Sequence, residues 1–235
     1  MREAIEYMRF AFLTVMVAGG LTISAPATAE TLEGVLKRMD QGAQGFKGMV
    51  ANLKRVTHTA VLNDNSEETG TIRLKRSSAR DLRVRIDFTT PDQYTVVFHG
   101  RKFEKYFPKI QTVQEYDLGK QRQLVDQFLL LGFGTSGTEL TRSYDVKFLG
   151  AAPANGQSAW HLELIPKSPE AREHLKKVEL WISAANGQPV QQTFHEPSGN
   201  YHLIAYSNVR LESSLSDKVL ELDLPKGVKR EYPQK

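Results

Sequence analysis

The 235-residue sequence contains no cysteine. It therefore has no disulfide, no thiolate nucleophile, no cysteine-bound zinc or iron–sulfur cluster, and no attachment point for the acyl anchor of a bacterial lipoprotein. A large excess of one charge is also missing, because 31 Lys and Arg face 27 Asp and Glu and give a net charge of +4. This small excess favours anionic surfaces only mildly, and it does not indicate nucleic-acid binding.

The common catalytic motifs are missing as well. There is no Gly-x-Ser-x-Gly elbow and no Ser-x-x-Lys. The six histidines form no His-Glu-x-x-His, and Pro197 after His195-Glu196 stops the helix that this zinc motif requires. Residues 132–137 match Gly-x-Gly-x-x-Gly, but a helix is expected before them and a strand after them, so we interpret them as a loop. We therefore expect no enzymatic activity and no metal, nucleotide or organic cofactor.

An export signal is expected at the N-terminus. Two arginines precede a short apolar stretch at residues 10–23, and the small residues Ala-Thr-Ala follow at 27–29. This is the layout of a secretory signal peptide, and the apolar stretch is shorter than the ~20 residues that span a bilayer. We expect residues 1–29 to be removed by cleavage after Ala29, and residues 30–235 to form a single domain in a bacterial periplasm.

Apolar periodicity predicts one short helix followed by a mainly β domain. Helical spacing favours a helix over residues 31–39, with Thr31 as its cap. From Ile72 onward, apolar and charged residues alternate as they do in half-buried strands. Strands are expected around residues 72–74, 82–88, 95–99, 103–107, 112–116, 144–148, 160–165, 178–182, 190–195, 201–209 and 219–224. The short turns between them predict an antiparallel sheet, curled or partly closed.

Two segments interrupt this alternation. Residues 121–131 are strongly apolar without alternation and predict a short helix. Residues 168–177 begin with Ser-Pro-Glu and predict a helical turn, with Pro169 at a tolerated first position.

A basic run precedes and enters the 82–88 strand. Its members are Arg73, Lys75, Arg76, Arg80, Arg83 and Arg85. Aromatic side chains do not share their face, so nucleic-acid binding is not expected and most of them should form a solvated outer strand face that protects an edge. Arg76 differs, because its parity matches the apolar Ile72 and Leu74. Either it points inward and needs acceptors, or the strand has ended and it turns outward.

The order of several motifs resembles the periplasmic outer-membrane lipoprotein carrier family, which is LolA-like. The motifs are Gly-Phe-Lys-Gly at 45–48, Gly-Thr-Ile-Arg-Leu-Lys-Arg at 70–76, His-Gly-Arg-Lys-Phe-Glu-Lys-Tyr-Phe-Pro at 99–108, and the stretches 178–190 and 220–228. The resemblance implies an unclosed antiparallel β-barrel whose mouth is covered by helices. It also implies a carrier of lipoprotein acyl chains between an inner-membrane release transporter and an outer-membrane acceptor.

The resemblance also implies a role for Arg76. The Lys75-Arg76-Ser77 step is similar to the Lys-Arg-Pro step of the family, whose arginine holds the lid closed. The sequence departs from the family at Ser77, where proline is usual, and at Arg83-Val84-Arg85, where an aromatic often follows an arginine. These departures leave room for a distant relative with another lipid ligand.

An acyl carrier needs an apolar hollow, since each CH₂ kept from water is worth ~0.8 kcal/mol. The candidate ligand-binding residues of the sheet are Leu74, Leu82, Val84, Ile86, Phe88, Val96 and Phe98, together with Arg76 as the latch that would hold the lid closed. The lid is the predicted helix at residues 121–131, and its candidates are Leu124, Phe128, Leu129 and Leu131. Each apolar one, taken singly, fits an ordinary core. The helix is the more informative signal, because its apolar residues lie on too many sides to pack on one sheet. The expected protein is monomeric; the alternative is a lipid- or protein-sensing regulatory module on the same fold.

Overall fold

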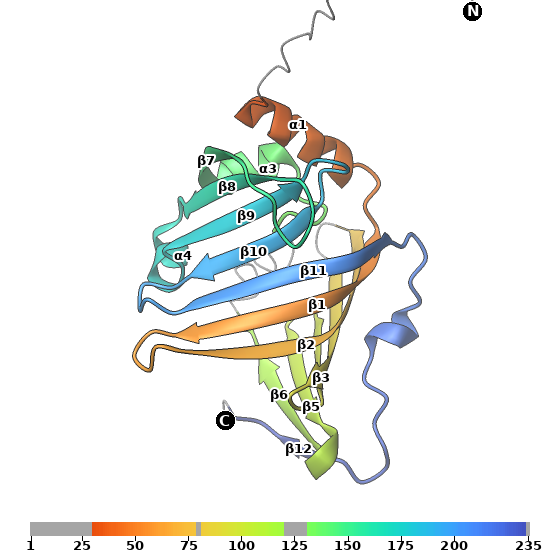
Figure 1. Cartoon of the computed structure of the whole chain (residues 1–235). Helices are drawn as coiled ribbons and strands as arrows, with labels where there is room; N and C mark the ends of the chain where they lie inside the picture. Colours follow the sequence, from red (N-terminus) through yellow and green to blue (C-terminus); the bar gives the residue numbers. More distant parts are fainter. Residues whose placement is uncertain (1–29, 79–80, 120–130, 234–235) are drawn as a thin grey trace, which may run out of the picture.

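The computed structural model describes residues 30–78, 81–119 and 131–233. Strands in these ranges form one twelve-stranded sheet in the order β12-β6-β5-β4-β3-β2-β1-β11-β10-β9-β8-β7. Their bounds are β1 Gly48–Thr59, β2 Asp64–Ser78, β3 Asp81–Thr90, β4 Tyr94–His99, β5 Lys102–Phe107, β6 Thr112–Asp117, β7 Tyr144–Ala151, β8 Ala159–Pro166, β9 Lys177–Ser183, β10 Pro189–His195, β11 Tyr201–Leu211 and β12 Lys229–Glu231. The sheet curls without closing (Figure 1), which confirms the expected fold class.

Two helices begin where the sequence places them. Helix α1, Leu32–Ala43, is capped by Thr31, whose side chain accepts a hydrogen bond from the Gly34 N–H at 3.1 Å. Helix α4, Pro169–His174, follows the cap Ser168 and has its proline in the first turn. Single 3₁₀ turns are η1, Pro108–Ile110, and η3, Asp217–Leu220. Within the described ranges, none of the helices has the length and apolarity that crossing a bilayer requires.

Helix α3, Gly137–Ser143, is not among the expected elements. Ser136 caps it by accepting from the Glu139 N–H at 3.1 Å, and the Glu139 carboxylate accepts from the Ser136 N–H at 3.0 Å. The sequence contains this capping box as Ser-x-x-Glu, but the glycines around it favour a loop. The expectation of a loop leading straight into a strand was therefore wrong after residue 136.

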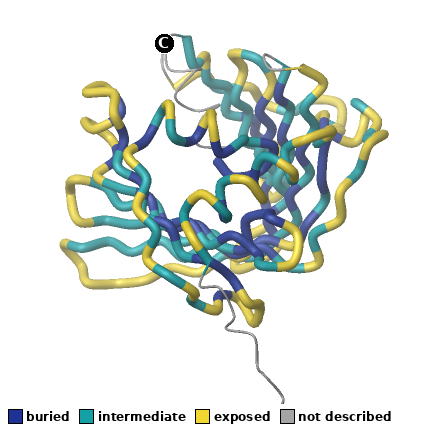
Figure 2. The backbone as a smooth tube through the Cα atoms, turned by 90° about the horizontal axis from the view of Figure 1, so that it is seen from above, coloured by how far each residue is buried: buried dark blue, intermediate teal, exposed yellow. Residues whose placement is uncertain are grey.

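Buried apolar residues form two main clusters, one on each half of the sheet. The first covers the inner face of β1–β4 and includes Phe133 and Tyr206. The second lies between α1, α3 and β7–β9. Figure 2, seen from above, shows buried residues concentrated in the strands and exposed residues mainly in the connecting loops.

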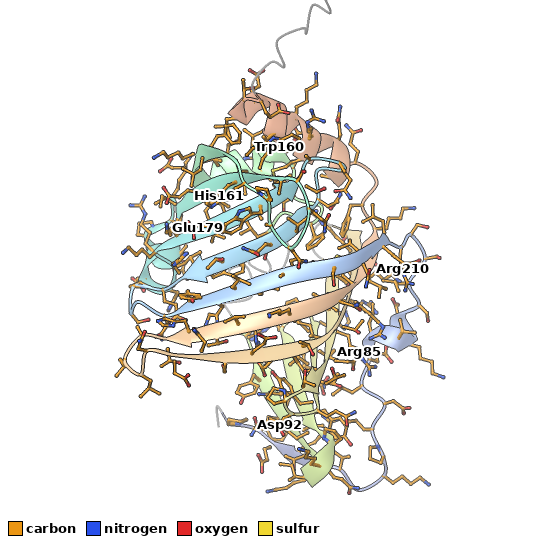
Figure 3. The ribbon with its side chains drawn as sticks, viewed as in Figure 1. Arg85, Asp92, Trp160, His161, Glu179 and Arg210 are labelled. Atoms are coloured by element: carbon orange, nitrogen blue, oxygen red, sulfur yellow. The ribbon has the colours of Figure 1, made fainter. Side chains whose placement is uncertain are left out.

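A C-terminal strap, residues 212–228, leaves β11 and runs along the outer face of the sheet to β12 (Figure 1). Its Asp217 pairs with Lys75 at 2.6 Å and with Arg83 at 2.9 Å. Arg85, labelled beside the strap in Figure 3, donates to the Glu221 carbonyl at 2.6 Å. The strap ends in β12, which pairs with β6 in parallel.

These contacts correct three expectations. The expected strand at 219–224 was wrong, because this stretch is a 3₁₀ turn and irregular chain whose Glu221 carbonyl bonds to a side chain instead of a strand. A purely antiparallel sheet was wrong for the β12–β6 pair. The basic outer face is neither free of partners nor at an edge, since β2 and β3 are central and Arg73 pairs with Asp87. Arg80 lies outside the described residues.

The strap should contribute measurably to stability. Leu220 is 2% exposed and lines a cleft together with Arg83 and Val97. Truncating it removes buried methyl groups, so Leu220→Ala should lower the free energy of unfolding by about 2–4 kcal/mol in urea titrations. Val219→Ala, at a neighbouring position that is 42% exposed, serves as the control and should change it by less than about 0.5 kcal/mol. Equal urea midpoints of unfolding for Leu220→Ala and Val219→Ala would show that the strap is not docked.

Candidate ligand-binding face

The structure brings the predicted sheet residues together on one inner face. Strand register places Leu74 beside Val84, and Val84 beside Phe98. Five of the predicted residues are almost completely buried in the first cluster: Leu74, Leu82, Val84, Phe88 and Phe98. The other two, Ile86 and Val96, are paired with each other and only half-buried against it. Among the predicted apolar residues of the sheet, these two leave apolar surface accessible.

Of the four predicted lid residues, the structure describes Leu131. Leu124, Phe128 and Leu129 lie outside the described residues. Leu131 is 2% exposed, but it belongs to the second cluster, with α1, α3 and β7–β9. Its side chain therefore packs on the other half of the sheet.

Arg76 points inward, which decides between the two orientations that the sequence left open. The β alternation continues to this residue, since Arg76 is paired with the buried Leu82. Its Nη1 donates to the Gly134 carbonyl at 2.6 Å, and its Nη2 lies 4.0 Å from the Glu139 carboxylate. The side chain is 19% exposed. The half-buried guanidinium thus finds the acceptors that its position requires.

Gly134 belongs to a tightly held loop, residues 131–136, that leads into α3. The Gln192 side-chain amide donates to the Leu131 carbonyl. Phe133 is fully buried, with its ring edge-on to Tyr206 at a centroid distance of 4.9 Å. Gly134 has φ +66 and packs on the Phe46 ring, where a Cβ would approach to 2.5 Å. Arg76 therefore fastens a loop that contacts both halves of the sheet.

Several aromatic residues of this face are not among the ligand-binding candidates that the sequence predicted. They are Phe46, Tyr94, Phe107, Phe133 and Tyr206. For Phe107, the alternation in the 103–107 strand was a usable signal, because it places residues 103, 105 and 107 on one side. The contacts of Phe46, Phe133 and Tyr206 depend on loop and strand positions that no local pattern defines.

A charged group at the other end of the face was also missed. Arg55 Nε donates to Glu68 at 2.8 Å, and its Nη2 donates to the Tyr94 hydroxyl at 2.8 Å. The Tyr94 hydroxyl in turn donates to the second Glu68 oxygen at 2.6 Å. Burial alone would raise the Glu68 pKa, but the hydrogen bonds from Tyr94 and Arg55 outweigh it and hold this pKa below its usual value. Arg55 also lies over the Phe88 ring at 4.6 Å.

Similar folds occur among solved structures of low sequence identity. An uncharacterised conserved protein from Thermus thermophilus has a TM-score of 0.53 and 14% identity, over 86% of this chain and 99% of that one. MucB has a TM-score of 0.49 and 16% identity over 81% of this chain, which spans only 62% of MucB. LprF from Mycobacterium bovis has a TM-score of 0.48 and 10% identity, over 84% and 100% of the two chains.

The sequence has no significant match among curated proteins. It does match a family profile described as "Outer membrane lipoprotein carrier protein LolA" over residues 44–223, which is well over half of the chain. That range contains the inner apolar face, Arg76 and the loop that Arg76 holds. The chain therefore belongs to the outer-membrane lipoprotein carrier (LolA) family.

Proposed function

We propose that this protein is a periplasmic carrier that binds the acyl chains of lipoproteins and transfers them from the inner to the outer membrane. Family membership supports a lipid- or protein-binding role over catalysis. In this proposal residues 1–29 are a cleaved export signal. The partners are acylated lipoproteins, an inner-membrane release transporter and an outer-membrane acceptor, and the carrier works as a monomer.

The observation that carries the proposal is the apolar inner face of an unclosed sheet. Acyl chains need apolar surface in place of a bilayer, because each exposed CH₂ costs ~0.8 kcal/mol. Ile86 and Val96 lie half-buried in the middle of that face, among residues that are buried. Sheets of this kind hold ligands when their inner side chains line a hollow instead of meeting a second layer.

A carrier must also release its cargo, so an empty closed state has to compete with the loaded state. The Arg76–Gly134 hydrogen bond would stabilise the closed state by joining the sheet to the loop ahead of α3. A hydrogen bond to a charged group contributes about 1.5–3 kcal/mol. This is enough to shift the balance between the two states by roughly a factor of ten or more.

The inner face can be tested by ligand capture. Mature protein recovered from a bacterial periplasm should carry acylated ligands that native mass spectrometry detects. Ile86→Glu places a carboxylate on the face between Ile72 and Val96 and should reduce the bound acyl material at least about tenfold, since an unpaired charge is costly in an apolar site. Thr89→Glu, at an exposed position of β3, should retain it. If both variants keep their ligand, the inner face is not the binding site.

The latch can be tested by comparing capture with delivery. Arg76→Leu removes the bond to Gly134 and should leave folding and capture largely intact, while delivery to an outer-membrane acceptor falls several-fold. Arg73→Leu removes the same group from the opposite face of β2 and should deliver normally. Normal delivery by Arg76→Leu refutes the latch. A wild-type protein that captures ligand and never delivers it contradicts the carrier and favours the sensing module.

A further inference from the structure

Lys105 lies on the apolar inner face of β5. It shares that side of the strand with Phe103 and Phe107, and its register partner on β4 is the half-buried Val96. The ammonium nitrogen is 4.3 Å from the centroid of the Tyr94 ring and 4.8 Å from that of Phe107. Lys105 is thus a cation among the side chains that the proposed function assigns to an acyl chain.

This cation has no anionic partner within the described part of the chain. The carboxylate of the neighbouring Glu68 is already used, because one oxygen accepts from Tyr94 and the other from Arg55. Burial and the nearby positive charge of Arg55 both lower the Lys105 pKa, and Glu68 offsets this only in part. The side chain is half-buried, so a ligand can still reach it.

Three lysines on the outer face of the sheet are paired with carboxylates. Lys102, on the same strand and the opposite face, lies 2.8 Å from Glu104 and 3.2 Å from Glu115. Lys54 pairs with Glu67 at 2.8 Å, and Lys177 pairs with Glu163 at 3.0 Å. These three lysines therefore have carboxylates beside them, whereas Lys105 faces aromatic and aliphatic side chains.

The charged end of the face lies opposite the latch. Phe88, under Arg55, and Leu82, beside Arg76, are at the two ends of the inner face of β3. The extended strand from one to the other is ~20 Å long. Asp92, labelled in Figure 3, is in the β3–β4 turn at the charged end. A long apolar chain that follows β3 from the latch would bring its head to Lys105.

We propose that Lys105, with Arg55 beside it, binds the anionic headgroup of an amphiphile whose chain lies along Phe88, Ile86 and Val96. The shared chemistry is a phosphate or carboxylate, which supplies the acceptor oxygens that Lys105 lacks. Ion pairs in partly dehydrated sites are stronger than in water, and the aromatic rings leave the ammonium hydrogens free to donate. This inference rests on the proposed acyl-binding function and adds that the headgroup of the ligand is negatively charged.

The test compares two amphiphiles with the same acyl chain. Lysophosphatidic acid and monoacylglycerol are titrated into the full mature protein, with inorganic phosphate alone as a third arm. We expect lysophosphatidic acid to bind about tenfold more tightly than monoacylglycerol, and inorganic phosphate not to compete. Lys105→Met should remove this preference, and a circular dichroism spectrum like that of the wild type checks that the variant is folded. Lys102→Met is the matched control and should keep the preference.

A second variant separates ligand binding from a structural role of Lys105. Glu68→Gln removes the negative charge that occupies Arg55, so lysophosphatidic acid should bind several-fold more tightly while monoacylglycerol is unaffected.

Equal affinity for the two amphiphiles, or a preference that survives Lys105→Met, overturns the headgroup site and leaves acyl binding standing. Competition by inorganic phosphate overturns the amphiphile in favour of a free anion. Failure of both amphiphiles to bind removes the proposed function and this inference with it.

Discussion

The inner face of an open, curled sheet must be covered by something other than the sheet itself. A closed barrel or a sandwich buries its inner residues against its own strands. Here the edge strands β12 and β7 end the sheet, and the cover among the described residues comes from α1, α3 and the loop at 131–136. A cover made of separate short elements is held by few bonds. The hydrogen bonds to the Gly134 and Leu131 carbonyls are therefore important for holding the cover on the sheet.

The two halves of the sheet solve this problem differently. On β7–β9 the helices pack closely, and α3 approaches α1 so tightly that a Cβ on Gly137 would lie 2.7 Å from Leu36. This half is a continuous core. On β2–β4 the only described cover of comparable burial is the loop carrying Phe133, and Ile86 and Val96 remain half-buried. The strap is docked on the outer face of that half, where it ties β2 and β3 to the C-terminus through Asp217.

Local periodicity predicts which way a strand residue faces, and on this point the sequence was informative. Leu74, Val84 and Phe98 lie on one face because side chains alternate with a period of two wherever a strand forms. The same rule misled at 219–224, where alternate leucines reflect one-sided contact of the strap without strand pairing. Partners distant in sequence, such as Gly134 for Arg76, depend on register and topology, and no local pattern contains them. The expectation that residues 30–235 form a single domain stays a prediction.

The charged side chains at the Tyr94 end of the inner face do not have equal explanations. Arg55 and Glu68 satisfy each other and Tyr94, so their mutual bonds offset much of the cost of burial. Lys105 bears part of the same dehydration cost. Within the described residues it makes no ion pair, and its two aromatic contacts are worth about 0.5–2 kcal/mol. An apolar residue between Phe103 and Phe107 would pack there without that cost. Among the described residues, stability therefore accounts for the ion pair and does not account for the lysine, whose charge the proposed anionic headgroup would balance.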